Sequence, residues 1–355
     1  MSPTRLPEGQ ALLEVRHAVR RWVAAHGTGA GVAVALSGGA DSLALTAAAV
    51  AEAGPVHALV VDHRLQDGSA AVAEQAAARA LALGCASARV LAVRVDRDGG
   101  LEAAARRARY DALGAARAGR PVLLGHTLDD QAETVLLGLS RGSGPRSLAG
   151  MRVFDEPWGR PLLAVRRGVT ARACEELELD PYRDPHNLSP EFTRVRLRSE
   201  ALPLLEQILG GGVAQALART ADQLREDGEV LDAIAVRVLA DARSGGPEIA
   251  DTAGGPEIAD TAGGPDVADA AGGLDVGELV DIHPAVRRRA LRVWLLANGA
   301  RDLTDRQLRA ADDLIGRWRG QGGVAIGGGG PGARLVLSRR HGRLTLGLTA
   351  IGPDR

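Results

Sequence analysis

Short unbroken apolar runs alternate with longer segments rich in Ala and Leu in the first part of the chain. Four such runs occur, at residues 32–36, 56–61, 90–95 and 122–124. Strands that are buried on both faces of a sheet have this continuous apolar pattern. The intervening segments predict helices, which lie at 8–26, up to about 53, at 69–83, at 101–118 and from about 129. The alternation predicts an α/β fold with a doubly wound parallel sheet and right-handed crossovers.

Polar clusters directly follow three of the predicted strands. They are residues 37–42, Asp62 with His63, and residues 126–133. Ligands of doubly wound sheets bind at the carboxyl ends of the strands. We therefore expect the functional site to combine these clusters.

The pattern becomes mainly helical after about residue 195. Helices are predicted at 196–208, 213–242, 284–296 and 304–318, the last opened by a capping box at Thr304 and Gln307. Short strands are predicted at 324–326, 334–337 and 344–348. We divide the chain into a catalytic domain, a long helix of a substrate domain, an acidic insertion and a small C-terminal region, at 1–210, 211–243, 244–278 and 279–355.

The acidic insertion contains a nine-residue repeat. Residues 245–253 recur identically at 254–262 and with changes at 263–271. Sequences of Gly, Pro and acidic residues bury little apolar surface, which predicts a flexible segment without chemistry. A calcium-binding β-roll is the alternative, but the Gly-Gly-x-Gly-x-Asp pattern of that fold is missing.

The distribution of charge permits a nucleic-acid partner. The net charge is −1, but residues 245–281 hold nine acidic and no basic residues, so the rest of the chain carries +8. Every basic residue is Arg, which can bind phosphate with two hydrogen bonds. Two isolated cysteines, Cys85 and Cys174, and no apolar run of about 18 residues predict a cytoplasmic protein without a membrane span.

The loop after the first strand has the composition of a phosphate-binding loop. It consists of Ser37, Gly38, Gly39, Ala40, Asp41 and Ser42. Two glycines allow successive backbone N–H groups to face an anion, and the following helix adds its dipole. The serine hydroxyls can donate to pyrophosphate, and Asp41 is a candidate ligand of Mg²⁺. The alternative is a tight strand-to-helix turn in which Asp or Ser caps the helix.

This loop resembles that of the PP-loop ATP pyrophosphatases, whose fold is of the adenine nucleotide alpha hydrolase-like type. Three more motifs, at 101–110, 125–144 and 184–203, are similar to those of the tRNA(Ile)-lysidine synthetase family. The resemblance runs from about 30 to 240 and more weakly from 283 to 348. It implies a ligase that uses ATP to attach L-lysine to the wobble cytidine of the isoleucine tRNA with a CAU anticodon, through an adenylated intermediate. The oligomeric state is left open, with a homodimer among the options.

The resemblance also implies catalytic residues. Asp41 belongs to the ATP loop, His126 is expected near the adenylate, and Arg194 and Arg196 are candidates for contact with the phosphate. Arg198 lies in the same stretch, and the sequence does not decide among the three arginines. Asp62, at the end of the second strand, can accept a hydrogen bond from the ribose or adenine.

The same resemblance assigns lysine binding to Arg106, Arg109, Asp130 and Glu133. Asp130 and Glu133 are three residues apart on a predicted helix and share one face, where two carboxylates suit an ammonium group. The alternative is that acids near a helix N-terminus only complement the helix dipole. Arg106 and Arg109 lie one turn apart, and their alternative is a solvated basic face.

Three other functions are considered. A tRNA thiolase on the same fold needs suitably placed cysteines, and neither Cys85 nor Cys174 belongs to a Cys-x-x-Cys motif. An amidotransferase-type synthetase needs a glutamine-hydrolysing module or an ammonia partner. A non-enzymatic RNA-binding protein does not need Asp41 or a pair of carboxylates such as Asp130 and Glu133.

Overall fold

The computed structural model describes residues 9–27, 29–65, 68–95, 100–142, 144–182, 191–244, 273–330 and 332–350. The chain forms two compact units, Met1–Leu224 and Arg225–Arg355. Their boundary falls inside helix α10 (Val213–Ser244), whereas the sequence suggested a division at residue 210. The acidic repeat at 245–271 and the motif residues 184–187 lie outside the described residues.

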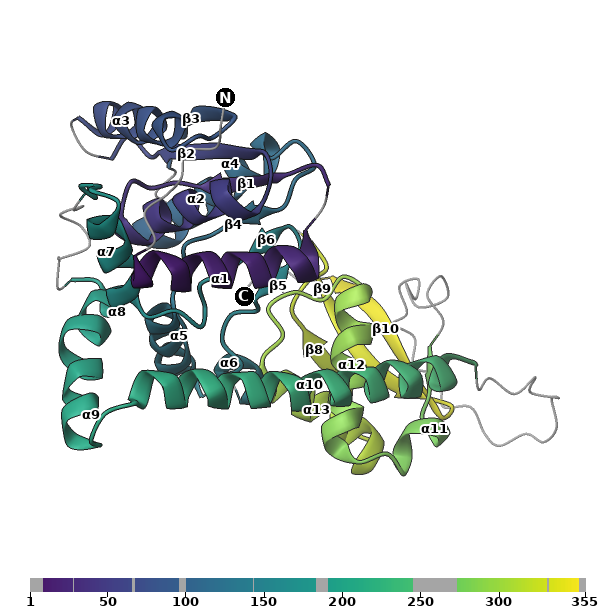
Figure 1. Cartoon of the computed structure of the whole chain (residues 1–355). Coiled ribbons are helices and arrows are strands. Elements are labelled where there is room, and N and C mark those ends of the chain that lie inside the picture. Colours follow the sequence, from purple (N-terminus) through teal and green to yellow (C-terminus); the bar gives the residue numbers. More distant parts are fainter. Residues whose placement is uncertain are drawn as a thin grey trace, which may run out of the picture. The chain divides into compact units, whose positions relative to one another are not determined.

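The first unit contains a six-stranded sheet in the order β3-β2-β1-β4-β6-β5 (Figure 1). Neighbouring strands are parallel except for β5, which is antiparallel to β6. The mainly parallel sheet confirms the predicted fold class. Its strands are β1 (Val32–Ala35), β2 (Val56–Asp62), β3 (Ser87–Ala92), β4 (Val122–Leu123), β5 (Phe154–Asp155) and β6 (Trp158–Gly159).

Side chains of alternate residues in the central strands enter two separate cores. In β1, Val32 and Val34 belong to the core on one face, and Ala33 belongs to the core on the other. The first face is covered by α1 (Gln10–His26), α2 (Ala40–Glu52), α3 (Ser69–Ala82) and α7 (Arg167–Glu176), and the second by α4 (Leu101–Ala116) (Figure 1). Both faces are covered, which explains the unbroken apolar runs in the sequence.

The sequence pattern did not reveal β5 and β6. Each has only two residues, and because one of the two is Asp155 in β5 and Gly159 in β6, neither forms an apolar run such as 122–124. Strand β3 lies at the edge of the sheet and is only partly buried. It begins at Ser87, earlier than the apolar run at 90–95 indicated.

The helix predicted at 196–208 is interrupted in the structure. It consists of α8 (Thr193–Arg196), a π-helical turn (Leu197–Ala201) and α9 (Leu202–Ile208). Pro203, at the start of α9, has no N–H group to donate to the preceding turn. Within the described ranges no single helix is long and apolar enough to cross a membrane, although the bent pair Thr193–Ile208 and Val213–Arg243 would suffice by length and composition.

The second unit contains an antiparallel sheet in the order β7-β10-β9-β8. The capping box of α13 is present as predicted, with the Thr304 hydroxyl accepting from the Gln307 N–H. Trp294, Leu291 and Leu295 of α12 lie at the centre of its core. The elements of this unit beyond α10 are β7 (Leu274–Asp275), α11 (Gly277–Val280), α12 (Pro284–Ala297), α13 (Asp305–Gly316), β8 (Val324–Ile326), β9 (Ala333–Arg340) and β10 (Arg343–Ala350).

Candidate active site

Strands β1 and β4 are parallel neighbours at the point where the order of the strands reverses. The chain builds β1, β2 and β3 outward in one direction and then returns to place β4 on the other side of β1. Doubly wound folds bind ligands at such a reversal, in the crevice outside the carboxyl ends of the strands. The loop 37–42 follows β1, and residues 125–133 follow β4. The fold therefore brings together two of the polar clusters that the sequence identified.

Hydrogen bonds of its own serines fix the conformation of the loop after β1. The Ser42 hydroxyl donates to the Gly39 carbonyl at 2.9 Å and accepts from the Ser37 N–H at 3.2 Å. Gly38 has a φ of +84°, a conformation that favours glycine. Gly39 is the N-cap of α2, and none of the described side chains caps this helix. The first N–H groups of α2 are therefore available to an anion.

Gly125 allows the loop after β4 to lie directly against the phosphate loop. A Cβ atom at this position would be 3.1 Å from both the Asp41 carbonyl carbon and the Ser42 backbone nitrogen. This is closer than side chains normally approach a backbone, so any larger residue would displace one of the two loops.

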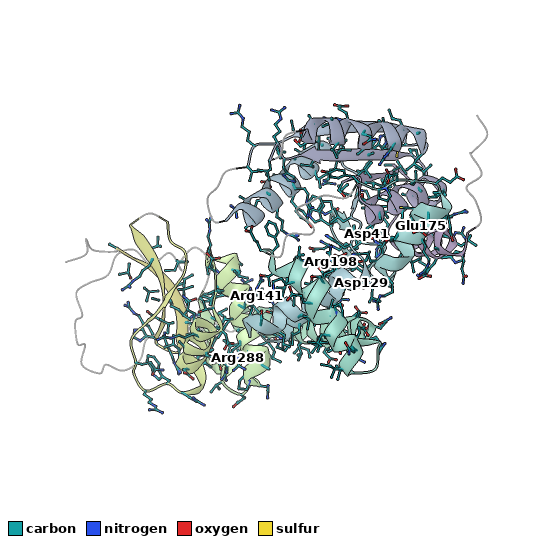
Figure 2. The ribbon with its side chains drawn as sticks, turned by 90° about the vertical axis from the view of Figure 1, so that its left-hand side faces the viewer. Asp41, Asp129, Arg141, Glu175, Arg198 and Arg288 are labelled. Atoms are coloured by element: carbon teal, nitrogen blue, oxygen red, sulfur yellow. The ribbon has the colours of Figure 1, made fainter. Side chains whose placement is uncertain are left out.

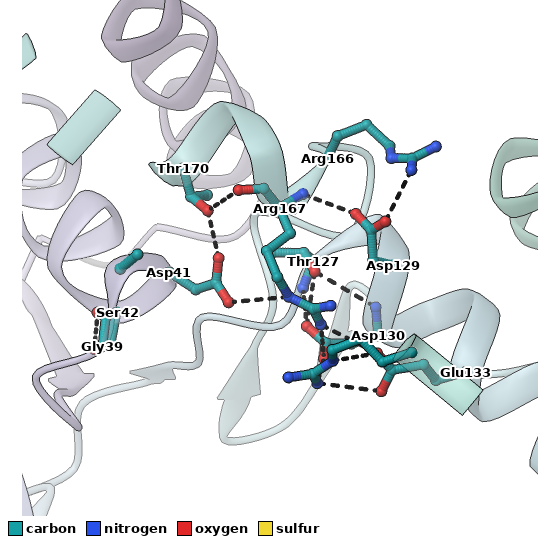
Figure 3. A network of polar contacts seen from close by, with 12 residues as sticks. Gly39, Asp41, Ser42, Thr127, Asp129, Asp130, Glu133, Arg166, Arg167 and Thr170 are labelled. Carbon is teal, nitrogen blue, oxygen red and sulfur yellow. Dashed lines mark hydrogen bonds and ion pairs between the residues drawn. The ribbon is translucent and has the colours of Figure 1, made fainter. Parts of the chain in front are cut away.

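Asp130 and Glu133, on α5 (Leu128–Arg141), share two arginine partners (Figure 3). Arg167 Nη2 lies 2.6 Å from Asp130 Oδ1 and 3.2 Å from Glu133 Oε1. Arg198 Nε lies 2.9 Å from Glu133 Oε1, and its Nη2 lies 3.3 Å from Glu133 Oε2 and 3.5 Å from Asp130 Oδ1. Glu133 is fully buried and Asp130 nearly so. Buried carboxylates require such cations because an isolated buried charge is very costly.

Asp130 also caps its own helix. Its Oδ2 accepts from the N–H and the hydroxyl of Thr127, both at 2.8 Å, and the Thr127 hydroxyl accepts from the Asp130 N–H. Asp130 can therefore serve its helix N-terminus and bind a cation at the same time, because Oδ2 bonds to the helix end and Oδ1 contacts a guanidinium group. The hydrogen bonds of Oδ2 fix the direction of Oδ1.

Asp41 joins the same network from the phosphate loop. Its Oδ2 lies 3.6 Å from Arg167 Nε, and its Oδ1 accepts a hydrogen bond from the Thr170 hydroxyl (Figure 3). Burial raises the pKa of Asp41 to about 6, with a further contribution from the negative charge of Asp130 and opposed by Thr170 and the arginines. Asp129 anchors the start of α7, because it accepts from the Arg167 N–H at 2.7 Å. Figure 2 shows Asp41, Asp129 and Arg198 in one region of the first unit.

His126 is influenced by the charges of both Asp130 and several arginines. Burial lowers the pKa of His126 to about 3, as do the charges of Arg160, Arg109 and Arg106, while Asp130 acts in the opposite direction. Burial also lowers the pKa of Arg109, helped by Arg106 and Arg194. His126 is therefore neutral at physiological pH, and Arg106, Arg109 and Arg160 are close enough to affect it.

Several buried polar atoms of this region have no hydrogen-bond partner among the described residues. They are the Nδ1 atoms of His63 and His126 and the Nε atoms of Arg109 and Arg160. Buried polar atoms in folded proteins are nearly always paired, so each exception needs a reason. A polar substrate with anionic groups would satisfy these atoms.

The structure brings some of the expected site residues together and not others. Asp41, Asp130 and Glu133 form one network, and His126, Arg106, Arg109 and Arg194 are linked through their electrostatic effects. Arg196 is not brought to the network: its side chain is 62% exposed and pairs with Glu200 at 3.1 Å. Arg198, on the next turn, contacts the acids instead.

Two further residues lie near the sheet. Asp62 is buried at the end of β2, where its Oδ1 accepts from the Arg64 N–H at 2.9 Å. Tyr110 packs edge-on against Trp158 with 4.6 Å between ring centroids, which agrees with a packing role.

Sequence reasoning missed the contribution of α7. Arg166 forms an ion pair with Asp129 at 3.0 Å, while Arg167 and Thr170 reach Asp130, Glu133 and Asp41. The sequence feature that could have indicated α7 is the pair of adjacent arginines, Arg166 and Arg167, at the start of a helix. Because the preceding strand β6 was not predicted, the sequence did not show that this helix begins near the site.

Comparison with known proteins agrees with this geometry. Residues 14–205 match the family described as "PP-loop domain", and residues 274–345 match the "TilS substrate binding domain". The first unit is therefore a PP-loop ATP-binding domain, followed by a separate substrate-binding domain.

Curated relatives show to which family of PP-loop proteins the chain belongs. The chain is 65% identical to the tRNA(Ile)-lysidine synthase of Rhodococcus jostii over 97% of this chain and 98% of that protein. It is 63% identical to the tRNA(Ile)-lysidine synthase of Nocardia farcinica, over 96% of this chain and all of that protein. The chain belongs to the tRNA(Ile)-lysidine synthase family. A solved structure, the U34-tRNA thiolase NcsA of Methanococcus maripaludis with its [4Fe-4S] cluster, matches at 19% identity with a TM-score of 0.48, covering 61% of this chain and 80% of that one.

Proposed function

We propose that this protein joins L-lysine to the wobble cytidine of the isoleucine tRNA with a CAU anticodon, using ATP. The cytidine O2 attacks the α-phosphate of ATP and pyrophosphate leaves. A lysine amine then attacks C2 of the adenylated base, and AMP leaves with the oxygen. The observation that carries this proposal is the network in which Arg167 contacts Asp41 of the phosphate loop together with Asp130 and Glu133. A nucleotide site and a cation site thereby share one crevice.

The phosphate loop suits the first step. Its glycines and the uncapped start of α2 provide N–H donors for pyrophosphate oxygens. The Ser37 and Ser42 hydroxyls bond to each other, and that of Ser42 also bonds to the Gly39 carbonyl, so they would donate to pyrophosphate only by exchanging these partners. Negative charge develops on phosphate as the cytidine attacks, and donors already in place stabilise that charge. The neutral ring of His126, next to this loop, can donate or accept a hydrogen bond there without adding charge.

Asp41 fits a Mg²⁺ ion that is bound mainly through the nucleotide. Among the residues that the structure describes, no cluster of three or more His, Cys, Asp or Glu side chains could form a metal site made by the protein alone. Mg²⁺ is commonly held by one or two carboxylates together with substrate phosphates and water. Burial raises the pKa of Asp41 to about 6, and a cation bound beside it would favour its charged form. The ion, when bound, neutralises charge on the phosphates.

Asp130 and Glu133 suit the lysine substrate. Asp130 Oδ1 and the Glu133 carboxylate already bind guanidinium groups, so this position selects for positive charge. Arg106, Arg109 and Arg194 provide positive charge around His126 for the lysine carboxylate or for phosphate. The substrate-binding domain match at residues 274–345 supports a tRNA partner for the second unit.

The thiolase alternative lacks reactive sulfur. Cys85 and Cys174 are both buried within the core of the first unit, and burial raises the pKa of each thiol to about 11. A thiol must be deprotonated to act as a nucleophile or to bind a metal. Neither cysteine can therefore carry sulfur in this structure.

Release of pyrophosphate tests the proposal. The protein is incubated with ATP, Mg²⁺ and the CAU-anticodon isoleucine tRNA, with and without lysine. We expect pyrophosphate release to require the tRNA, and AMP release to require lysine as well. Pyrophosphate release without any tRNA, or AMP release that ignores lysine, would contradict the proposal.

A further inference from the structure

Arg167 occupies the position that the proposed function assigns to a substrate ammonium group. Its Nη2 bridges Asp130 Oδ1 at 2.6 Å and Glu133 Oε1 at 3.2 Å. With Arg198 on the same two carboxylates, the three oxygens that could receive a cation all have a guanidinium partner. The fourth, Asp130 Oδ2, is used by Thr127. An incoming ammonium group would therefore compete with the two arginines for these oxygens.

The contacts of the two arginines differ in a way that selects Arg167 for displacement. Arg198 binds Glu133 with two nitrogens, one on each carboxylate oxygen. Paired hydrogen bonds of this kind are among the strongest that a carboxylate makes. Arg167 contacts both carboxylates through a single nitrogen, Nη2. Loss of Arg167 from the pair breaks two contacts of one nitrogen and leaves Arg198 in place.

Arg167 also has a second partner beside the nucleotide. Its Nε lies 3.6 Å from Asp41 Oδ2, and Asp41 belongs to the phosphate loop. Its backbone is fixed, because its N–H donates to Asp129 at 2.7 Å, so only the side chain needs to move. Phosphate groups at the loop would add negative charge on the Asp41 side and draw the guanidinium towards it.

We infer that Arg167 is a positioning residue that keeps the Asp130 and Glu133 carboxylates occupied until nucleotide binds, and then moves towards the phosphates and releases them to the lysine substrate. This inference rests on the proposed function. It makes nucleotide and lysine binding mutually favourable, because the same side chain responds to both. Without nucleotide, lysine must compete with Arg167, and the crevice discriminates against binding the amino acid first.

Calorimetric titration of L-lysine tests this, with and without α,β-methylene ATP and Mg²⁺. In the wild-type protein we expect lysine to bind at least about fivefold more tightly when the nucleotide analogue is present, the low end of typical coupling between two sites. In Arg167→Met, lysine affinity should be the same with and without the analogue. It should also exceed the wild-type affinity measured without nucleotide, because the competing cation is gone.

Arg166→Met is the matched control. Arg166 is the adjacent arginine and also pairs with an acid of α5, but that acid is Asp129, and its other partners are Glu206 and Gln215. This variant should keep the wild-type ratio of lysine affinities. Arg167→Gln retains side-chain N–H donors and replaces Arg167→Met if the latter does not fold, as judged from circular dichroism, with the same expected result.

The outcomes separate the two proposals. If Arg167→Met or Arg167→Gln keeps the wild-type ratio, or if Arg166→Met loses it as well, Arg167 is not the coupling residue. If the wild-type protein binds lysine equally with and without the analogue, the inference fails and the proposed function stands. If the wild-type protein binds no lysine in either state, the proposed function itself fails.

Discussion

The substitution Asp41→Asn is expected to stabilise the folded protein at neutral pH while it abolishes activity. The pKa of Asp41 is raised from 3.8 to about 6, which means that the folded state binds this proton more tightly than the unfolded chain. At about 1.4 kcal/mol per pH unit, the charged form costs at most about 3 kcal/mol. The Asp41 side chain is 26% exposed, so solvent screening reduces this to about 1–2 kcal/mol. Asn keeps an oxygen for Thr170 and carries no charge to bury.

The sign of the effect depends on pH. Well below pH 3.8 Asp41 is protonated in both states, and its favourable contribution is fully present. That contribution decreases as the pH rises from 3.8 and is lost above about 6 in the wild type, but not in Asp41→Asn. The variant should therefore be close to the wild type at pH 4 and exceed its free energy of unfolding by about 1–2 kcal/mol at pH 8.

Urea unfolding of the full chain, followed by circular dichroism at pH 4, 6 and 8, measures this difference. Asp155→Asn is the matched control, since Asp155 is exposed on β5 and the same chemical change there should have no such pH dependence. A variant that is less stable than the wild type at pH 8, or a difference that does not change with pH, would refute the reasoning. The same Asp41→Asn protein should release no pyrophosphate with ATP and tRNA, because Asp41 is the proposed ligand of Mg²⁺.

Three other substitutions or titrations test separate parts of the site. Glu133→Gln should retain tRNA-dependent pyrophosphate release but raise the KM for lysine at least about tenfold, since a buried charge that faces the substrate is removed; an unchanged KM would exclude Glu133 from lysine binding. Gly125→Ala should weaken ATP binding by about 1–2 kcal/mol, a factor of about 5–30, because its Cβ would push on the loop at Asp41. Gly114→Ala, whose Cβ would meet open space, should leave ATP binding unchanged, and equal effects of the two would show that the loop contact is irrelevant. The ring of His126, with a pKa near 3, should show no change of charge between pH 5 and 8 in an NMR titration, and a midpoint in that range would contradict its burial as a neutral side chain.

The parts of the fold that the sequence revealed are those with long or repeated signals. The apolar runs predicted the first four strands, β1 to β4, and their signal is clearest in β1 and β2, where helices bury both faces. Thr304 and Gln307 gave the start of α13 because a capping box is local and depends on residues three apart. The strands β5, β6 and β7, with two residues each, carry no periodic signal and become strands only by pairing with distant segments.

In the candidate site, too, the sequence predicted local relations between residues but not contacts between distant segments. Asp130 and Glu133 could be assigned to one helix face from their spacing, but their partners Arg167 and Arg198 lie at least 34 residues away in the sequence. Spacing also could not choose between Arg196 and Arg198. Residues two apart do not share a helix face, and in the structure Arg196 faces solvent while Arg198 reaches the acids.

The most direct test of the account is the mass of the wobble nucleoside after reaction. The CAU-anticodon isoleucine tRNA is incubated with the protein, ATP, Mg²⁺ and L-lysine, digested to nucleosides and analysed by mass spectrometry. The account predicts that one cytidine per tRNA gains the mass of lysine less one water, only when ATP and lysine are both present. An unmodified cytidine under these conditions, or a gain in mass from sulfur instead of lysine, would contradict it.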